Sequence, residues 1–306
     1  MVYVEKIKVK GKTYYKLVHA VRKGSKVLHK SRYLGKLLPS KARLNHLKAE
    51  FLSDLHTGRY FSEKDVQEIE KAKSNYNNEI KKLGHLEKEN KLKEFIIRFT
   101  YDSSKLSGVA ITLRQTSLIL KEGLIPKDLK NLKTVKEIEN HEKGIIAITK
   151  YKGALDLRFI KKLHLILFSG IDNSIAGKLR YELKRDVKLA GTPYVPPKWH
   201  ELKKELTNFF KWYKAESRKL HPLELAALVH LKLISLQPFT DGNSRISRLL
   251  MNWIMWKKGY PAIDIPVEDL ENYYSALDMY QIEKDEKPFI QYIKKKYLDK
   301  SLGIFK

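Results

Sequence analysis

A proline between two apolar helical patterns constrains the fold of this chain more than any other feature of its sequence. Before it, apolar residues recur at three- and four-residue spacing, which is typical of a buried helix: Leu223, Ala226, Ala227, Leu231 and Ile234. Proline disfavours helix at the residue before it, so the chain must turn at Gln237 and Pro238. A second stripe then predicts a new helix: Ile246, Leu249, Leu250, Trp253 and Ile254. We therefore expect two helices joined by a turn, with residues 242–244 at the N-terminus of the second.

This predicted helix start suits a bound anion. The first backbone N–H groups of a helix have no partner within it, and the helix dipole adds positive charge there, which favours phosphate. Arg245 and Arg248 follow about one turn apart and can add charge-assisted hydrogen bonds. An ordinary capped helix start would show the same Asp-Gly-Asn pattern, so a purely structural turn is the alternative.

Composition limits the remaining function classes. The 306 residues, 42% apolar, suffice for one large or two modest domains with a buried core. The chain has no cysteine, which excludes disulfides, thiolate metal sites and cysteine nucleophiles. Its net charge of +26 favours nucleotides, nucleic acids and acidic proteins as partners, although a lysine-rich thermophilic surface would give the same sign. No apolar run approaches the ~20 residues that cross a bilayer, so we expect no membrane partner and a cytoplasmic location.

Residues 1–36 predict a small, basic β module. Apolar and polar residues alternate with a period of two in three runs, separated by turn signals at Gly11 and Gly24, so we expect a three-stranded antiparallel meander. Residues 1–50 hold 14 Lys and Arg against 2 Asp and Glu, or 14 − 2 = +12. Lysine, arginine and tyrosine together on a sheet suit nucleic-acid contact. A sheet with one buried face and one solvated basic face is the alternative.

From residue 37 onward the pattern is helical. One stripe runs from Leu44 to Leu55, a capping box at Ser62 and Asp65 predicts the start of a second helix, and a third helix includes Phe95 and Phe99. We expect a helical linker region over residues 37–94 and the main domain over residues 95–300.

The segment after the first buried helix resembles the signature of a known family. Residues 237–248 read Gln-Pro-Phe-Thr-Asp-Gly-Asn-Ser-Arg-Ile-Ser-Arg, which is similar to the Fic signature His-Pro-Phe-x-Asp-Gly-Asn-Gly-Arg-x-x-Arg. Further matches lie upstream and downstream: Gly177 and Arg180, His230, and Gly259-Tyr260-Pro261. The resemblance implies a mainly α fold, a Fic-type helical bundle with a short β-hairpin flap, preceded here by the N-terminal antiparallel β module. It also implies transfer of AMP from ATP to a Ser, Thr or Tyr hydroxyl of a protein.

The resemblance assigns roles in binding ATP, or another nucleoside triphosphate, with Mg²⁺. Asp241 would hold Mg²⁺, which prefers oxygen ligands. The backbone of Gly242, Asn243 and Ser244 would cradle the phosphates, Asn243 would orient them, and Arg245 and Arg248 would pair with them. Ser244 replaces a glycine of the signature and would cost ~1–2 kcal/mol if its backbone needed a positive φ.

Gln237 is the main departure from the signature. In the family a histidine at this position takes the proton from the attacking hydroxyl, and a carboxamide is far too weakly basic to do so near pH 7. General-base catalysis contributes about 10²–10⁴ in rate, so we expect transfer slowed by that order. Three other histidines read better as structural residues than as a substitute base: His164, His221 and His230.

A self-inhibitory motif of the family, Ser/Thr-x-x-x-Glu-Gly, has a remnant at Ser103, Ser107 and Gly108. Ser107 stands where the family's glutamate would pair with the second signature arginine, so no carboxylate is expected beside Arg248. A plain loop and helix cap is the alternative reading of this stretch.

Residues 187–194 align with the family's flap, which holds a target segment by strand addition. The candidate flap residues precede Thr192, since the prolines after it cannot donate to a ladder: Lys188, Leu189, Ala190 and Gly191. A surface loop is the alternative.

Three hypotheses follow from these observations. The chain transfers a nucleotide slowly onto a partner protein or onto itself; or it is a catalytically silent nucleotide-binding regulator; or it acts chiefly as a nucleic-acid binder through residues 1–50. A second copy of the chain is a further candidate partner.

Overall fold

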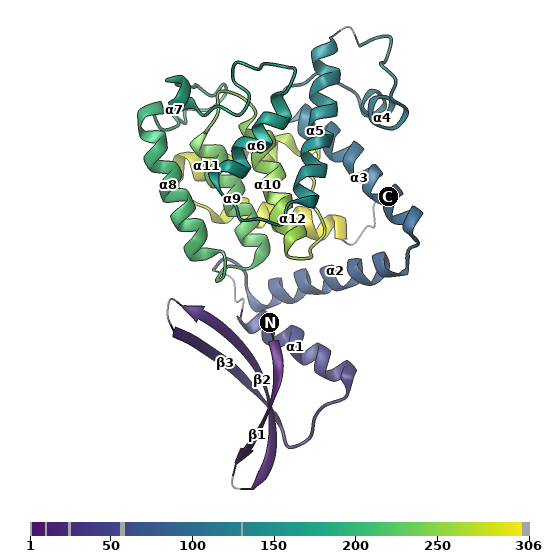
Figure 1. The fold of residues 1–306 in the computed structure, drawn as a ribbon, viewed down its shortest axis with the longest axis vertical. Helices are drawn as coiled ribbons and strands as arrows, with labels where there is room; N and C mark the ends of the chain where they lie inside the picture. The colour runs from purple at the N-terminus through teal and green to yellow at the C-terminus, as the bar shows by residue number, and fades with distance from the viewer. Residues whose placement is uncertain (1, 10, 24–25, 56–58, 130, 302–306) are drawn as a thin grey trace. The chain divides into compact units, whose positions relative to one another are not determined.

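The computed structural model describes residues 2–9, 11–23, 26–55, 59–129 and 131–301. The chain is mainly helical with one small antiparallel sheet at its N-terminus, which confirms the expected fold class (Figure 1). It divides into two compact units, Met1–Lys71 and Ala72–Lys306. The boundaries expected at residues 36 and 94 stay predictions.

The N-terminal unit contains the predicted meander. Its strands pair in the order β1-β2-β3, all antiparallel: β1 (Val2–Val9), β2 (Lys12–Lys23) and β3 (Lys26–Gly35). The turn signal at 24–25 lies outside the described residues. Leu17, Val18 and Phe51 are buried, which gives this unit a small core. Helix α1 (Lys41–Leu55) follows the sheet.

Helix α2 (Glu63–Lys82) begins where the capping box predicts. The Ser62 N–H donates to the Asp65 carboxylate at 2.9 Å, and the Asp65 N–H donates to the Ser62 hydroxyl at 3.2 Å. These bonds satisfy two of the backbone groups that a helix start leaves without partners.

The second unit is a helical bundle. Its further elements are α3 (His85–Lys105), α4 (Leu113–Glu122), α5 (Leu132–Lys150), α6 (Leu157–Phe168), α7 (Arg180–Leu183), α8 (Trp199–Glu216), α9 (Pro222–Leu236), α10 (Asn243–Lys257), the 3₁₀ turn η1 (Val267–Asp269), α11 (Leu270–Glu283) and α12 (Lys287–Ser301).

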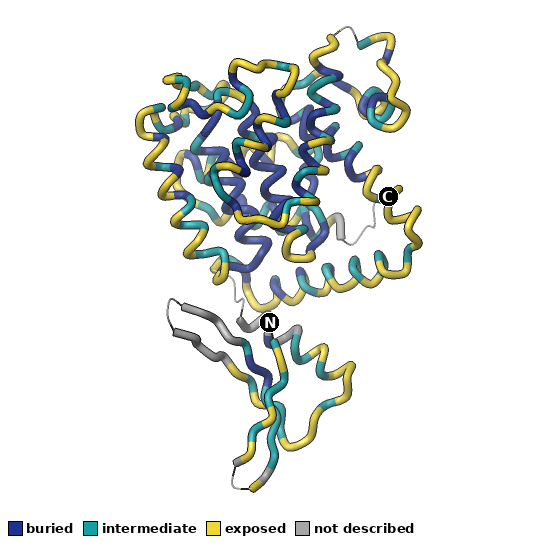
Figure 2. Tube along the Cα trace, viewed as in Figure 1, coloured by how far each residue is buried: buried dark blue, intermediate teal, exposed yellow. Residues whose placement is uncertain are grey.

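Helices α9 and α10 form the centre of this bundle because neither has a continuous polar face. They pack against each other, and α10 also contacts α3, α5 and α6 while α9 contacts α8, α11 and α12. Buried residues run along almost the whole of both helices, and Figure 2 shows the buried colour concentrated inside the bundle. The predicted turn after Gln237 therefore lies between the two most buried helices of the unit.

The flap segment differs from expectation in one respect. Residues 185–198 contain no strand and have a turn around Gly191, so the expected β-hairpin is an open loop in this structure. Pro193, Pro196 and Pro197 explain the difference, since they remove backbone donors from one arm. Among the described residues, no helix combines the length and the apolar character needed to cross a membrane.

Candidate functional site

Arg180 fixes the turn that ends α9. Gln237 takes a left-handed conformation with φ 47°, and its carbonyl accepts from Arg180 Nε at 2.5 Å. Arg180 Nη2 donates to the Leu236 carbonyl at 3.1 Å, and the Arg180 backbone N–H donates to Pro238 O at 2.9 Å. This side chain is fully buried. It thus satisfies carbonyls that the helix end leaves without partners.

Asn243 closes the turn from the other side. Its Oδ1 accepts from the Phe239 N–H at 2.9 Å, and its Nδ2 donates to Phe239 O at 2.8 Å and to Gln237 Oε1 at 2.7 Å. The Gln237 amide donates in turn to the Ile234 carbonyl at 2.7 Å. The carboxamide of Gln237 is therefore bonded at both ends within the protein, and Asn243 shapes the turn itself.

Gly242 is the position where only glycine fits. It caps the N-terminus of α10 with φ 77°, and a Cβ built there would lie 2.5 Å from Phe168 Cε2. Ser244, by contrast, lies in the first turn of α10 and is not among the residues with positive φ. The strain considered for Ser244 therefore does not arise, because the left-handed residue of the turn is Gly242.

His164 supports the same turn from α6. Its Nδ1 accepts from the Gly177 N–H at 2.8 Å, which leaves Nε2 to donate to the Asp241 carbonyl at 3.2 Å. The imidazole stacks on Phe239 with ring centroids 3.9 Å apart. Burial lowers the pKa of His164 to about 4, so the ring is neutral at pH 7. Its position on an apolar stripe predicts packing, but nothing in the sequence indicates these two hydrogen bonds.

A cavity of about 660 Å³ lies beside this turn. Its lining comes from four places: the residues directly after α3, the flap segment, the end of α9 with the turn and the first residues of α10, and one face of α11. Predicted site residues on its wall are Ser107, Gly108, Lys188, Leu189, Ala190, Gly191, Gln237, Asp241, Gly242, Asn243 and Ser244. The fold thus brings together three segments that the sequence separates by up to 137 positions.

The α10 helix start faces this cavity without a side-chain cap. Its first N–H groups are consequently available to an anion in the cavity. Asp241 lies at the same edge with a largely exposed side chain, and its Oδ1 accepts from the Gly242 N–H at 2.5 Å. No group of three or more histidines and carboxylates that could hold a metal occurs in the described part of the chain.

Arg245 is buried beneath the turn rather than on the cavity wall. Its guanidinium lies 3.8 Å from Glu137 Oε1 and 3.6 Å from Asp241 Oδ2, and it packs over the Phe168 ring. Arg245 Nε is buried without a hydrogen-bond partner in the described structure. Sequence reasoning missed Glu137 and Phe168, since nothing in their local pattern relates them to residues 242–248.

Arg248 is held by the end of α3. Its Nε donates to Ser103 Oγ at 2.9 Å, and its Nη2 donates to Ser103 O at 2.7 Å and to Ser107 Oγ at 2.8 Å. Ser107 Oγ also lies 3.1 Å from Ser244 Oγ. The segment at 103–108 is therefore more than a helix cap, because it ties Arg248 to the first turn of α10 through hydroxyl groups.

The flap segment is anchored at its far side. Thr192 Oγ1 donates to Asp278 Oδ1 at 3.0 Å, and the Tyr194 hydroxyl donates to Ser235 O at 3.0 Å. These contacts place the residues before Thr192 over the cavity.

The other two candidate histidines have structural partners. His230 is fully buried, lies 3.1 Å from the Tyr273 hydroxyl and stacks on Phe289, and burial lowers its pKa well below the usual value. His221 Nδ1 accepts from the Leu223 N–H at the start of α9. Neither residue lines the cavity.

Comparison with known proteins agrees with this geometry. Residues 154–255 match the model of the Fic/DOC family. Proteins named protein adenylyltransferase Fic from Drosophila grimshawi and Drosophila melanogaster are each 34% identical to this chain over 205 residues, or 66% of its length. The matched region covers 41% and 40% of those relatives, so the chain spans about two fifths of their length.

Two solved structures share the fold. A Fic domain containing signaling protein from Bacteroides thetaiotaomicron superposes with a TM-score of 0.70 at 27% identity, covering 77% of this chain and 94% of that one. Fic-1 from C. elegans gives a TM-score of 0.67 at 22% identity, covering 86% of this chain and 76% of that one.

Proposed function

Because this chain carries a Fic/DOC family domain, we propose that the cavity beside Gly242 binds ATP, or another nucleoside triphosphate, with Mg²⁺. We further propose that the chain is a Fic-type nucleotidyltransferase whose transfer of AMP to a protein hydroxyl is slow. The observation that carries the first proposal is the uncapped, left-handed start of α10 facing a cavity of about 660 Å³. That volume suits a nucleotide, since ligand pockets commonly measure about 300–1,000 Å³.

Several groups of the chain are suited to the phosphates. The first N–H groups of α10 would donate hydrogen bonds to phosphate oxygens at the positive end of the helix. Arg245 and Arg248 lie behind this turn, at 4% and 0% exposure, where a charge acts more strongly than in bulk water. Arg245 now contacts Glu137 and Asp241, and Arg248 contacts the two serines. In the described structure each also keeps one buried nitrogen without a hydrogen-bond partner, Arg245 Nε and Arg248 Nη1.

Asp241 is the residue that would hold Mg²⁺. Mg²⁺ is commonly held by one or two carboxylates together with substrate phosphates and waters. The single exposed carboxylate of Asp241 beside the anion site is consistent with this type of coordination. When bound, Mg²⁺ would offset the negative charge of the phosphates. To hold Mg²⁺, Asp241 Oδ2 would leave the Arg245 guanidinium, which now lies 3.6 Å away, and Oδ1 would release the Gly242 N–H to a phosphate.

Gln237 is the reason to expect slow transfer. When a target hydroxyl attacks the α-phosphorus, its proton needs an acceptor, and the Gln237 carboxamide is too weakly basic and already bonded to Asn243 and Ile234. The chain would still orient the reactants and stabilise charge. The acceptor hydroxyl, on a partner or on the chain itself, would approach past the flap residues.

The locked carboxamide also favours a second function, that of a catalytically silent nucleotide-binding regulator. Nucleotide binding without any AMP transfer would identify it. Incubation with ATP labelled at the α-phosphate separates the two, since only the transferase leaves label on protein.

A third function rests on the N-terminal unit, for which we propose nucleic-acid contact. Residues 1–50 carry a charge of +12, and exposed Tyr3 and Tyr33 accompany exposed Lys6 and Lys8 on its sheet. Tyrosines suit base stacking and lysines suit phosphates. Affinity for single-stranded nucleic acid that falls steeply with salt and is lost on deleting residues 1–50 would support it.

Calorimetric titration with ATP and Mg²⁺ tests the main proposal. We expect saturable binding that Arg245→Ala weakens by at least about tenfold, since a lost charge-assisted bond is worth ~1.5–3 kcal/mol. Arg158→Ala is the matched control, because Arg158 is 94% exposed on α6 and lies away from the cavity. Equal affinity in both variants would contradict the proposed site.

A further inference from the structure

We propose that a second pocket, formed by α2, α3 and the end of α10, binds a small aromatic carboxylate. The pocket has a volume of about 160 Å³, and its lining residues are Tyr76, Ile80, Lys88, Lys91, Leu92, Phe95, Trp256 and Ala262. This inference does not depend on nucleotide binding, because the two pockets share no residue.

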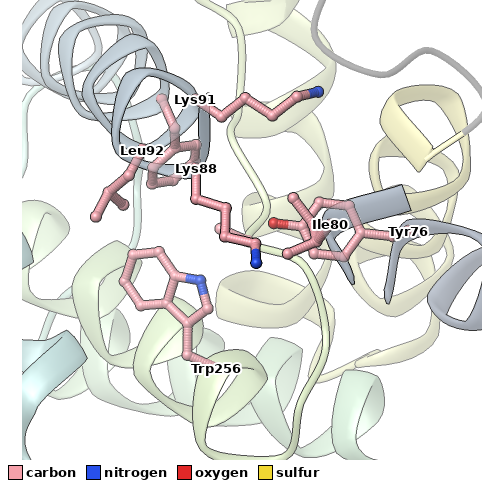
Figure 3. A pocket seen from close by; sticks show the side chains of 8 residues that line it. Tyr76, Ile80, Lys88, Lys91, Leu92 and Trp256 are labelled. Carbon is pink, nitrogen blue, oxygen red and sulfur yellow. The ribbon is translucent and has the colours of Figure 1, made fainter. Parts of the chain in front are cut away.

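The walls of this pocket suit a flat ring. Phe95 packs edge-on against Trp256, with ring centroids 5.6 Å apart and planes at 77°. Figure 3 shows the indole of Trp256 on one side of the space and the Tyr76 ring with Ile80 on the other. An aromatic ring placed between such walls gains offset or edge-to-face contact in addition to burial of apolar surface.

The polar groups of the pocket are donors. In Figure 3 the Lys88 ammonium and the Tyr76 hydroxyl point into the same space, and the indole nitrogen of Trp256 faces it. Within the described structure these three groups have no hydrogen bond to the protein. Burial raises the pKa of Tyr76, so its hydroxyl keeps its proton and can donate. A ligand that satisfies them must be an acceptor, and an anion satisfies Lys88 best.

Neighbouring carboxylates do not fill this role. Glu87 Oε2 accepts from the Gly84 N–H at 2.7 Å at the start of α3, and Glu89 pairs with His85 at 3.8 Å. Lys88 and Lys91 form no ion pair in the described part of the chain. The positive charge at the rim therefore favours an acidic ligand from outside.

Size decides between ligand classes. A volume of 160 Å³ lies below the ~300 Å³ at which common ligand pockets begin, so it excludes a nucleotide and leaves room for about one ring with its carboxylate. The pocket lies at the C-terminal end of α10, whereas the phosphate site lies at the N-terminal end, about 20 Å away along a 15-residue helix.

Benzoate is the probe, with acetate and benzyl alcohol as comparators that keep only the charge or only the ring. Two-dimensional ¹H–¹⁵N NMR of the full chain follows the four tryptophan indole N–H signals, with Trp256→Phe to assign its signal. We expect benzoate to shift the Trp256 signal saturably, and acetate and benzyl alcohol to bind at least about tenfold more weakly.

Two lysine variants complete the test. Lys88→Gln should weaken benzoate binding by at least about tenfold, as expected for a lost charged hydrogen bond. Lys93→Gln, on the same helix but outside the lining, should leave it unchanged. An absent or non-saturable shift at Trp256, equal binding of acetate or of benzyl alcohol, or an equal loss in both lysine variants would each overturn the proposal.

Discussion

Replacement of Gly242 by alanine should destabilise the protein more than the same change at the other end of α10. Gly242 and Gly259 both have a left-handed backbone, with φ 77° and 74°. The backbone cost of alanine in this region is about 1–2 kcal/mol and should be similar at both positions.

The two sites differ in the space around the new methyl group. At Gly242 the Cβ would lie 2.5 Å from Phe168 Cε2 and 3.1 Å from Cζ, whereas at Gly259 nothing lies within 4 Å. Phe168 cannot move away easily, because it is buried between His164, stacked at 4.5 Å, and the Arg245 guanidinium at 5.1 Å. Overpacking of this kind costs about 1–3 kcal/mol.

Gly242→Ala should therefore lower the free energy of unfolding by about 2–5 kcal/mol in total, and Gly259→Ala by only about 1–2 kcal/mol. Urea denaturation followed by circular dichroism measures both variants against the parent chain. Equal losses in the two variants would refute the argument that Phe168 excludes a side chain at Gly242.

Three further predictions concern the proton acceptor at Gln237, the hydrogen bond from Arg248 to the Ser107 hydroxyl and the buried carboxyl group of Asp102. Gln237→His should raise the transfer of label from α-labelled ATP by about 10²–10⁴, and no gain would mean that the missing base is not the limiting defect. Ser107→Glu should place a carboxylate beside Arg248 and weaken ATP binding in calorimetry, with Ser107→Ala as the control that adds no charge. Burial, with the neighbouring Asp264, raises the pKa of Asp102 to about 7. The protonated carboxyl group therefore stabilises the fold fully below pH ~4, and this stabilisation is lost as the pH rises to about 7. Asp102→Asn should remove that loss, so its unfolding free energy relative to the parent should rise between pH 4 and 7, and a constant difference in denaturation midpoints would contradict the assignment.

Local sequence patterns predicted the elements that depend on local forces. The end of α9 follows from Pro238, the start of α2 follows from Ser62 and Asp65, and the three strands follow from alternation. Each of these rests on neighbours within a few positions, where backbone sterics and capping act. The hairpin flap that the family resemblance implies is absent from the described residues 185–198, and the alternative of a surface loop holds for this segment.

The supports of the turn could not be predicted in the same way. His164 meets the Asp241 carbonyl across 77 positions, and Arg248 meets Ser103 across 145. Such contacts depend on how the helices pack against each other, and the spacing of residues along the chain does not reveal that packing. Glu137, which lies beside Arg245, shows this most clearly. In the sequence it is indistinguishable from the other charged residues on the polar face of an amphipathic helix.

The central claim is that the start of α10 holds the phosphates of a nucleotide. A crystal structure of the full chain with Mg²⁺ and a non-hydrolysable ATP analogue measures this directly. Our account predicts phosphate oxygens within hydrogen-bond distance of the N–H groups at residues 242–244, with Mg²⁺ on Asp241. A cavity that stays empty at saturating nucleotide, or a nucleotide bound elsewhere on the chain, would contradict it.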